Sequence, residues 1–347
     1  MLKTLYVHIG PPKTGTTSIQ DTFRANAALL EQHGFFYYTG HKSHHAVALH
    51  MCERDRLPRH RKWHDDFFAK AAATRCETGM LSTEFMIRLS QEEIESAIAK
   101  FQGIAGHVKV LCYARHPVPF AVSAAHQAIR GAKEVAHVEA SPNMRQHSAL
   151  FRRWEEAVGR ENMIVRAFDR DALPKGDVVE DVINLVGLQD LSPQIERHRS
   201  NEGLSVLGAQ LLDAVSQRLK DNPVEVRYVK LLRNIKGPRY VLPAKTLDVV
   251  RRKTAADVAQ LREEWGIDLK EPSMPPYSPP PLSEEEIASL ADAVVDILRL
   301  ARKEEKTPPP PPEPQGVLAR LAARLRPRSG PRKATSVEDD EEAASER

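Results

Sequence analysis

The sequence predicts an α/β protein in which helices flank a central parallel sheet, and three observations carry this prediction. Leu5–Ile9 is a short apolar run that ends at Gly10 and precedes a helical pattern, Thr16–Gly34. Val108–Tyr113 and Met163–Arg166 are further short apolar runs with helical patterns after them. Strands buried inside a parallel sheet have this near-continuous apolar character. With 347 residues, 41% of them hydrophobic, the chain is long and apolar enough for a substantial core.

The remaining elements follow in order along the chain. Phe35–Tyr38 and Gly79–Glu84 are short strand patterns, the second ending in the carboxylate of Glu84. Ser90 and Glu93 form a capping-box pattern that opens a helix running to Phe101. Helices are also predicted for Ala46–Glu53, Arg61–Thr74, Val118–Gly131, Asn143–Val158, Asp177–Val186, from about Leu204, and for Pro243–Trp265.

The loop between the first strand and the first helix predicts a phosphate-binding site. It runs from Gly10 to Gly15, so its free N–H groups and the helix dipole point at the same place. Lys13 adds a full positive charge, and the hydroxyls of Thr16, Thr17 and Ser18 add hydrogen-bond donors. The alternative is an ordinary Gly/Pro turn before a helix.

The position of the lysine distinguishes this loop from an ATP-type P-loop, in which the lysine directly follows the second glycine. Here Thr16 occupies that place and Lys13 lies inside the loop. The pattern resembles the 5′-phosphosulfate loop of sulfotransferases that use 3′-phosphoadenosine 5′-phosphosulfate (PAPS). Within that family, it is similar to the loop of the bacterial cytoplasmic branch. The resemblance implies a catalytic role for Lys13 and cofactor binding by Pro12, Lys13, Thr14, Gly15, Thr16, Thr17 and Ser18.

A second segment carries the same resemblance. Arg115 follows the strand pattern Val108–Tyr113, and Ser123 lies eight residues later on the predicted helix. The segment resembles the second sulfotransferase signature, in which such an arginine and serine hold the nucleotide's 3′-phosphate. Arginine offers phosphate a bidentate fork and serine a neutral donor. His116 departs from the signature, where aspartate is common; the alternative for Arg115 is a structural ion pair. The resemblance covers roughly residues 4–205.

Three side chains are candidates for the general base that takes the acceptor's proton: His44, His45 and Glu84. Glu84 follows a strand, so its carboxylate should face the same crevice as Lys13. Histidine has the more suitable ordinary pKa, whereas Glu84 would need burial to raise its pKa. The alternatives are a glutamate that only pairs near the next helix and histidines at the surface. His41, His44, His45 and His50 lack a standard zinc-ligand spacing, so no metal is expected.

Composition and cysteine usage indicate a cytoplasmic enzyme. A net charge of +3 is too small to imply nucleic-acid binding. Cys52, Cys76 and Cys112 are odd in number and lack C-x-x-C spacing, as expected for reduced thiols. The first strand begins close to Met1, which leaves no room for a signal peptide, and no apolar run is long enough to span a membrane.

The sequence predicts three regions. Residues 1–270 form the sulfotransferase-like α/β domain, helical from about residue 204, and residues 271–304 form a proline-rich linker with a capped helix, Ser283–Lys303. Residues 305–347 are expected to be a disordered, proline-rich and charged tail, since twelve of the 25 prolines lie between Pro272 and Pro314. A short basic amphipathic segment, Val317–Arg326, would allow weak contact with a membrane surface.

The expected function is transfer of a sulfuryl group from PAPS to an acceptor hydroxyl or amine. A carbohydrate or glycolipid acceptor is suggested by analogy alone. A P-loop kinase or phosphotransferase and a non-enzymatic nucleotide-binding interaction protein are the alternatives. The sequence does not indicate the identity of the acceptor or the oligomeric state.

Overall fold

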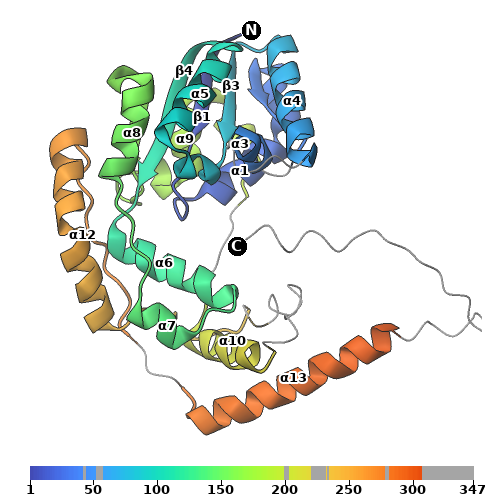
Figure 1. The fold of residues 1–347 in the computed structure, drawn as a ribbon, viewed down its shortest axis with the longest axis vertical. Coiled ribbons are helices and arrows are strands. Elements are labelled where there is room, and N and C mark those ends of the chain that lie inside the picture. The colour runs from blue at the N-terminus through green and yellow to red at the C-terminus, as the bar shows by residue number, and fades with distance from the viewer. Residues whose placement is uncertain are drawn as a thin grey trace, which may run out of the picture. The chain divides into compact units, whose positions relative to one another are not determined.

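The computed structural model describes residues 1–41, 44–51, 58–198, 203–219, 232, 234–277 and 281–306 (Figure 1). The chain divides into two compact units, Met1–Asp296 and Ile297–Arg347. The sheet and the candidate site lie in the first unit. The second unit begins within a helix that extends to Lys306. The predicted tail after Lys306, including Val317–Arg326, lies outside the described residues.

A five-stranded sheet in the order β2-β3-β1-β4-β5 forms the centre of the described chain, and every neighbouring pair is parallel. This confirms the predicted fold class. The strands are β1 (Leu2–His8), β2 (Phe35–Tyr37), β3 (Thr78–Ser82), β4 (Ala105–Ala114) and β5 (Met163–Ala167). After β1 the chain forms the edge strand β2, returns to β3 between β2 and β1, and then crosses to β4 and β5 on the other side of β1. Ligands of open α/β sheets bind where the strand order reverses in this way, at the carboxyl ends of the strands.

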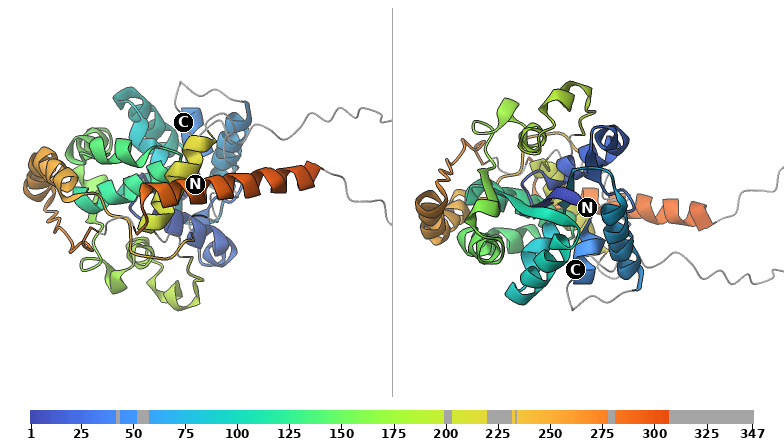
Figure 2. Two further views of the ribbon diagram at one scale, coloured as in Figure 1. Left: turned by 90° about the horizontal axis from the view of Figure 1, so that it is seen from below. Right: turned by 90° about the horizontal axis from the view of Figure 1, so that it is seen from above.

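Helices cover both faces of the sheet, which gives the predicted three layers (Figure 2). Successive residues of a strand point to opposite faces. In β4, Val110 and Cys112 therefore pack in one core cluster, and Leu111 and Tyr113 in the other. The helices are α1 (Thr16–Ala25), α2 (Ala27–Gln32), α3 (His45–Met51), α4 (Pro58–Ala73), α5 (Gln91–Gln102), α6 (Pro117–Arg130), α7 (Val135–Ala140), α8 (Ser148–Val158), α9 (Val178–Leu185), α10 (Val206–Arg218), α12 (Ala244–Trp265) and α13 (Glu284–Lys306).

A third hydrophobic cluster joins α6, α10 and α12, and it includes Val122 of α6, Leu212 of α10 and Val250 of α12. Helix α6 begins after only two residues beyond β4, so it starts at the carboxyl end of the sheet. The cluster thus packs α6, which carries Ser123, against the helices α10 and α12 from the C-terminal half of the chain.

Two predicted helices differ from the observed ones by more than three residues. The predicted helix Thr16–Gly34 is interrupted at Asn26, whose side-chain amide donates to the Thr22 and Glu196 carbonyl oxygens and whose side-chain oxygen accepts from the Glu196 amide. The helix predicted from Asn143 begins only at Ser148. There the buried Asp257 carboxylate on α12 accepts hydrogen bonds from the backbone amides of His147 and Ser148. In both cases a contact more than 100 residues away in sequence decides the helix boundary.

Local capping predictions agree with the structure. Ser90 and Glu93 form the predicted capping box at the start of α5. The strand pattern toward Glu84 ends at Ser82, after which Thr83 caps a short 3₁₀ helix, Glu84–Arg88. The observed helix α7 was not predicted.

The capped helix near the C-terminal end is observed as α13, with Ser283 and Glu286 hydrogen-bonded to each other's backbone amides. Its buried residues include Ile287, Ala291 and Val295, whereas Leu290 is exposed. No helix in the described part of the chain is both long and apolar enough to cross a membrane.

Candidate active site

The loop after β1 has a backbone conformation that depends on its glycines. Gly10 and Gly15 have φ values of +86° and +78°, and Lys13 between them has a φ of +70°. A Cβ atom on Gly15 would lie 2.5 Å from Cγ1 of Val178, and one on Gly10 would lie 3.2 Å from Cβ of Glu84. The loop is therefore held between the start of α9 and the segment that follows β3.

The start of α1 has the properties of an anion site. No side chain among the described residues caps this helix, and Gly15 occupies the N-cap position. The hydroxyl of Thr16 is buried and has no hydrogen-bond partner within the described chain. Thr17 is exposed and Ser18 is partly exposed. A bound anion would satisfy both the free N–H groups and the buried hydroxyl.

The Thr14 side chain forms a hydrogen bond within the loop. It is fully buried, and its hydroxyl donates a hydrogen bond of 2.6 Å to the carbonyl oxygen of Pro11. The Thr14 side chain therefore stabilises the loop from within, and only its backbone amide remains for a ligand.

Arg115 contacts the loop directly. Its Nη1 donates a hydrogen bond of 2.6 Å to the carbonyl oxygen of Lys13, and its guanidinium lies 5.4 Å from the ring centroid of Phe168. The alternative prediction for Arg115 was a structural ion pair, whereas the observed partner is a backbone carbonyl oxygen. The spacing of the residues in the sequence does not reveal this contact. Arg115 connects the two predicted phosphate-binding segments, because it follows β4 and holds the loop after β1.

Ser123 and His116 lie on the segment that follows Arg115. Ser123 is partly exposed on α6. His116 is the N-cap of α6, and its Nδ1 accepts a hydrogen bond from the backbone amide of Val118. The histidine thus serves as a helix cap, a role that aspartate also fills.

Positive charge is concentrated around Lys13. Burial lowers the pKa of the Lys13 ammonium group, and the Glu84 carboxylate opposes this change. The guanidiniums of Arg130 and Arg115 lower the same pKa further. Burial also lowers the pKa of Arg115 to about 10, with a further contribution from Arg239. A partly buried cluster of cations favours a ligand with several negative charges.

Arg130 and Arg239 were not predicted as site residues. Arg130 is the last residue of α6, seven residues after Ser123, a spacing that places both on one side of a helix. Arg239 belongs to a segment that forms a hydrogen bond with His126 of α6. The Nδ1 atom of His126 accepts from the Leu204 amide, and its Nε2 donates to the Tyr240 carbonyl oxygen. The basic, glycine-containing run Lys236–Arg239 was the available sequence signal.

A cavity of about 150 Å³ lies beside this segment. Its walls include the start of α10 and the basic run, so it extends the cationic cluster. It is lined by Gly203, Leu204, Ser205, Asn234, Ile235, Lys236, Gly237 and Arg239.

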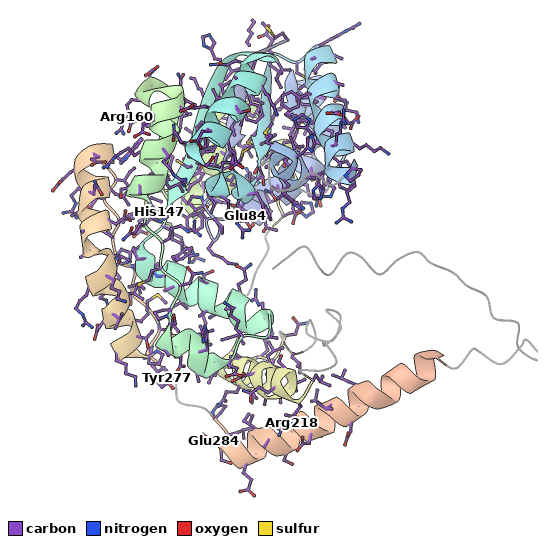
Figure 3. The ribbon with its side chains drawn as sticks, viewed as in Figure 1. Glu84, His147, Arg160, Arg218, Tyr277 and Glu284 are labelled. Atoms are coloured by element: carbon purple, nitrogen blue, oxygen red, sulfur yellow. The ribbon has the colours of Figure 1, made fainter. Side chains whose placement is uncertain are left out.

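Glu84 lies near Lys13, as the strand-end argument predicted. The backbone of Gly10 approaches Glu84, and each of the Lys13 and Glu84 charges shifts the pKa of the other. Burial raises the pKa of the Glu84 carboxyl group. The charges of Lys13, Arg145 and Arg88 oppose that rise. Figure 3 labels Glu84 near the carboxyl end of the sheet.

The structure separates the two histidine candidates. His44 is buried, its Nδ1 accepts from the Ser82 amide at 2.9 Å, and its Nε2 donates to the Tyr38 carbonyl oxygen at 2.8 Å. With both ring nitrogens occupied, His44 has no lone pair for an acceptor proton. His45 is partly exposed, and its ring centroid lies 5.2 Å from that of Phe85. Burial, followed by the charges of His41 and His60, lowers the pKa of His45 to about 4.

No group of three or more His, Cys, Asp or Glu side chains that could hold a metal ion occurs among the described residues. Cys76 and Cys112 are buried free thiols, and Cys52 lies outside the described chain.

Comparisons with known proteins give a likeness of fold. No family model and no curated protein matches the sequence. Among solved structures, a sulfotransferase from Alicyclobacillus acidocaldarius is similar to this chain at 17% sequence identity and a TM-score of 0.42. The match covers 78% of this chain and 97% of the other. A likeness of this degree does not assign an activity, which depends on the site residues themselves.

Proposed function

We propose that the protein is a sulfotransferase that moves a sulfuryl group from PAPS to an acceptor hydroxyl or amine. The observation that carries the proposal is the hydrogen bond from Arg115 to the backbone of Lys13. It joins an uncapped helix start, suited to a 5′-phosphosulfate, to an arginine suited to a 3′-phosphate. Arg130 and Arg239 add the positive charge that a nucleotide with phosphates at both ends of its ribose would need.

In the proposed reaction, the acceptor oxygen or nitrogen forms a bond to sulfur while the bond from sulfur to the bridging oxygen breaks. Negative charge then grows on the bridging oxygen, which leaves as part of the 5′-phosphate. The ammonium of Lys13 and the N–H groups at the start of α1 stabilise that charge. These donors are held by the glycine-dependent loop before the reaction begins, so little reorganisation accompanies bond cleavage.

We propose Glu84 as the base that receives the acceptor proton. Its carboxylate lies near Lys13, and burial raises its pKa toward the range in which a carboxylate accepts a proton more readily. The pKa of His45, lowered to about 4, makes that ring a weaker base than an ordinary histidine. Glu84→Gln should therefore lower kcat at least 100-fold, on the scale of lost general-base catalysis. His45→Ala should lower it much less, and the reverse order would assign the role to His45.

The decisive experiment measures thermal stabilisation of the purified full chain by nucleotides. We expect 3′-phosphoadenosine 5′-phosphate to raise Tm by several degrees without added metal, because a ligand at 100 times its Kd adds about 2.7 kcal/mol to stability. ATP with Mg²⁺ has no 3′-phosphate and should stabilise the protein much less. A phosphotransferase would show the opposite order, and a protein without a nucleotide site would respond to neither.

Two arginine variants make the experiment specific. Arg115→Ala should weaken binding of the 3′,5′-bisphosphate roughly 10- to 100-fold, the scale of a lost charged hydrogen bond. Arg262→Ala is the matched control, because Arg262 is exposed and pairs with Asp268 outside the site. Stronger stabilisation by Mg-ATP than by the bisphosphate would overturn the proposed function, and equal affinity of wild type and Arg115→Ala would overturn the role of Arg115.

A further inference from the structure

A second, larger cavity of about 420 Å³ lies next to the segment that carries Glu84. Its walls come from the 3₁₀ helix Glu84–Arg88 and from α8 with the residues before it. Three arginines and one glutamate in the lining give it a formal charge of 3 − 1 = +2. It is lined by Ile87, Arg145, Gln146, Ala149, Leu150, Arg152, Arg153 and Glu156.

Two of the three arginines have protein partners. Arg153 donates hydrogen bonds to the carbonyl oxygens of Leu89 and Ile87, at 3.0 and 3.3 Å. Arg152 forms an ion pair of 2.8 Å with Glu264. The contacts of Arg153 hold one wall of the cavity, and the Glu264 carboxylate offsets the charge of Arg152.

Arg145 differs from the other two. Its guanidinium lies 5.4 Å from the ring centroid of Phe120, and its Nε is buried without a hydrogen-bond partner in the described chain. No carboxylate of the described residues forms an ion pair with it. The guanidinium is therefore positioned by an aromatic ring, and no hydrogen bond to another described residue occupies its Nη donors.

Arg145 also connects the cavity to the proposed base. Burial lowers the pKa of Arg145 and the Glu84 carboxylate opposes this change, while the Arg145 charge opposes the rise that burial causes in the pKa of Glu84. The 3₁₀ helix Glu84–Arg88 lies between the loop after β1 and the cavity, because a Cβ on Gly10 of the loop would lie 3.2 Å from Cβ of Glu84 and Ile87 of the same helix lines the cavity.

We propose that the acceptor carries a carboxylate, sulfate or phosphate group, which binds Arg145 in this cavity while the acceptor's hydroxyl or amine lies at Glu84. The inference rests on the proposed function and narrows its acceptor to an anionic compound. A cavity of this volume accommodates a small acceptor of about one or two sugar rings. A planar guanidinium with free donors is suited to a bidentate contact with an oxyanion.

The first test uses inorganic sulfate as the probe, so it does not depend on knowing the acceptor. The full chain is saturated with 3′-phosphoadenosine 5′-phosphate, which fills the nucleotide phosphate sites, and sulfate is then titrated in a thermal-shift assay. We expect sulfate to stabilise the wild type further, with an apparent affinity at least tenfold higher than for Arg145→Ala. Arg145→Lys should retain part of the effect, because it keeps the charge but loses the fork. Arg262→Ala, which removes an exposed arginine outside the cavity, is the matched control and should respond like the wild type.

The second test compares two acceptors that differ in one group, methyl β-glucuronide and methyl β-glucoside, using PAPS and release of the bisphosphate. We expect kcat/KM to be at least tenfold higher for the glucuronide, and Arg145→Ala to remove that preference. Equal sulfate binding by wild type and Arg145→Ala would overturn the inference, and so would an undiminished glucuronide preference in that variant. Failure of the proposed function is a separate outcome, since the bisphosphate would then not stabilise the wild type before sulfate is added.

Discussion

Gly15→Ala tests whether the geometry of the phosphate-binding loop controls nucleotide binding. The Cβ atom of an alanine at position 15 would reduce the stability of the protein in two ways. A left-handed backbone costs an alanine roughly 1–2 kcal/mol, because its Cβ approaches the following carbonyl oxygen. The Cβ would also lie 2.5 Å from Cγ1 of Val178, closer than two carbon atoms can pack. Relieving such an overlap typically costs about 1–3 kcal/mol. Gly15→Ala should therefore destabilise the protein by roughly 2–5 kcal/mol.

Gly34→Ala is a matched control, since Gly34 has nearly the same φ, +76°, but nothing lies within 4 Å of the site of its Cβ. Only the backbone cost of about 1–2 kcal/mol should remain there. The free energies of unfolding are measured by urea denaturation, and the affinity for 3′-phosphoadenosine 5′-phosphate by titration calorimetry. Gly15→Ala should weaken nucleotide binding at least tenfold, whereas Gly34→Ala should leave it unchanged.

A third variant isolates the overlap with Val178. In a Val178→Ala background the Cγ1 atom is absent, so the cost of Gly15→Ala should fall toward that of Gly34→Ala, a coupling that a double-mutant cycle measures. If Gly15→Ala costs no more than Gly34→Ala and binds the nucleotide normally, the argument that close packing positions this loop is wrong.

Three further predictions concern catalysis, capping and acid stability. Lys13→Ala should lower kcat roughly 100-fold or more, the scale for loss of one transition-state donor, and unchanged turnover would refute its role. Asp257→Ala removes the acceptor of the His147 and Ser148 amides and should cost about 3 kcal/mol, whereas the exposed Asp248→Ala should cost under about 1 kcal/mol; equal effects in urea denaturation would contradict this. Burial lowers the pKa of His8 to about 3 and of His44 to about 4, so the unfolded chain binds protons that the folded chain does not as the pH falls below about 6.5. Stability should therefore decrease between pH 6.5 and pH 4, and a flat urea midpoint over that range would contradict the burial argument.

The sequence alone determined the sheet strands, the phosphate-binding loop and the spacing from Arg115 to Ser123. These features are local, because apolar runs, glycines at turns and a capping box act over a few residues. The sequence alone also shows that Lys13 lies inside the loop rather than after Gly15, and this position is the reason for proposing a phosphosulfate ligand rather than ATP.

Only the tertiary structure decided which of these groups act together. His44 and His45 are neighbours in the sequence with the same chemistry, yet the backbone of Ser82 and Tyr38 occupies both nitrogens of His44 alone. Arg130, Arg145 and Arg239 lie at least 15 residues from the predicted basic residues Lys13 and Arg115, and the packing of α6, α8 and the segment before α12 positions their charges. Long-range contacts of this kind depend on the whole core, so no pattern within a short window of residues can predict them.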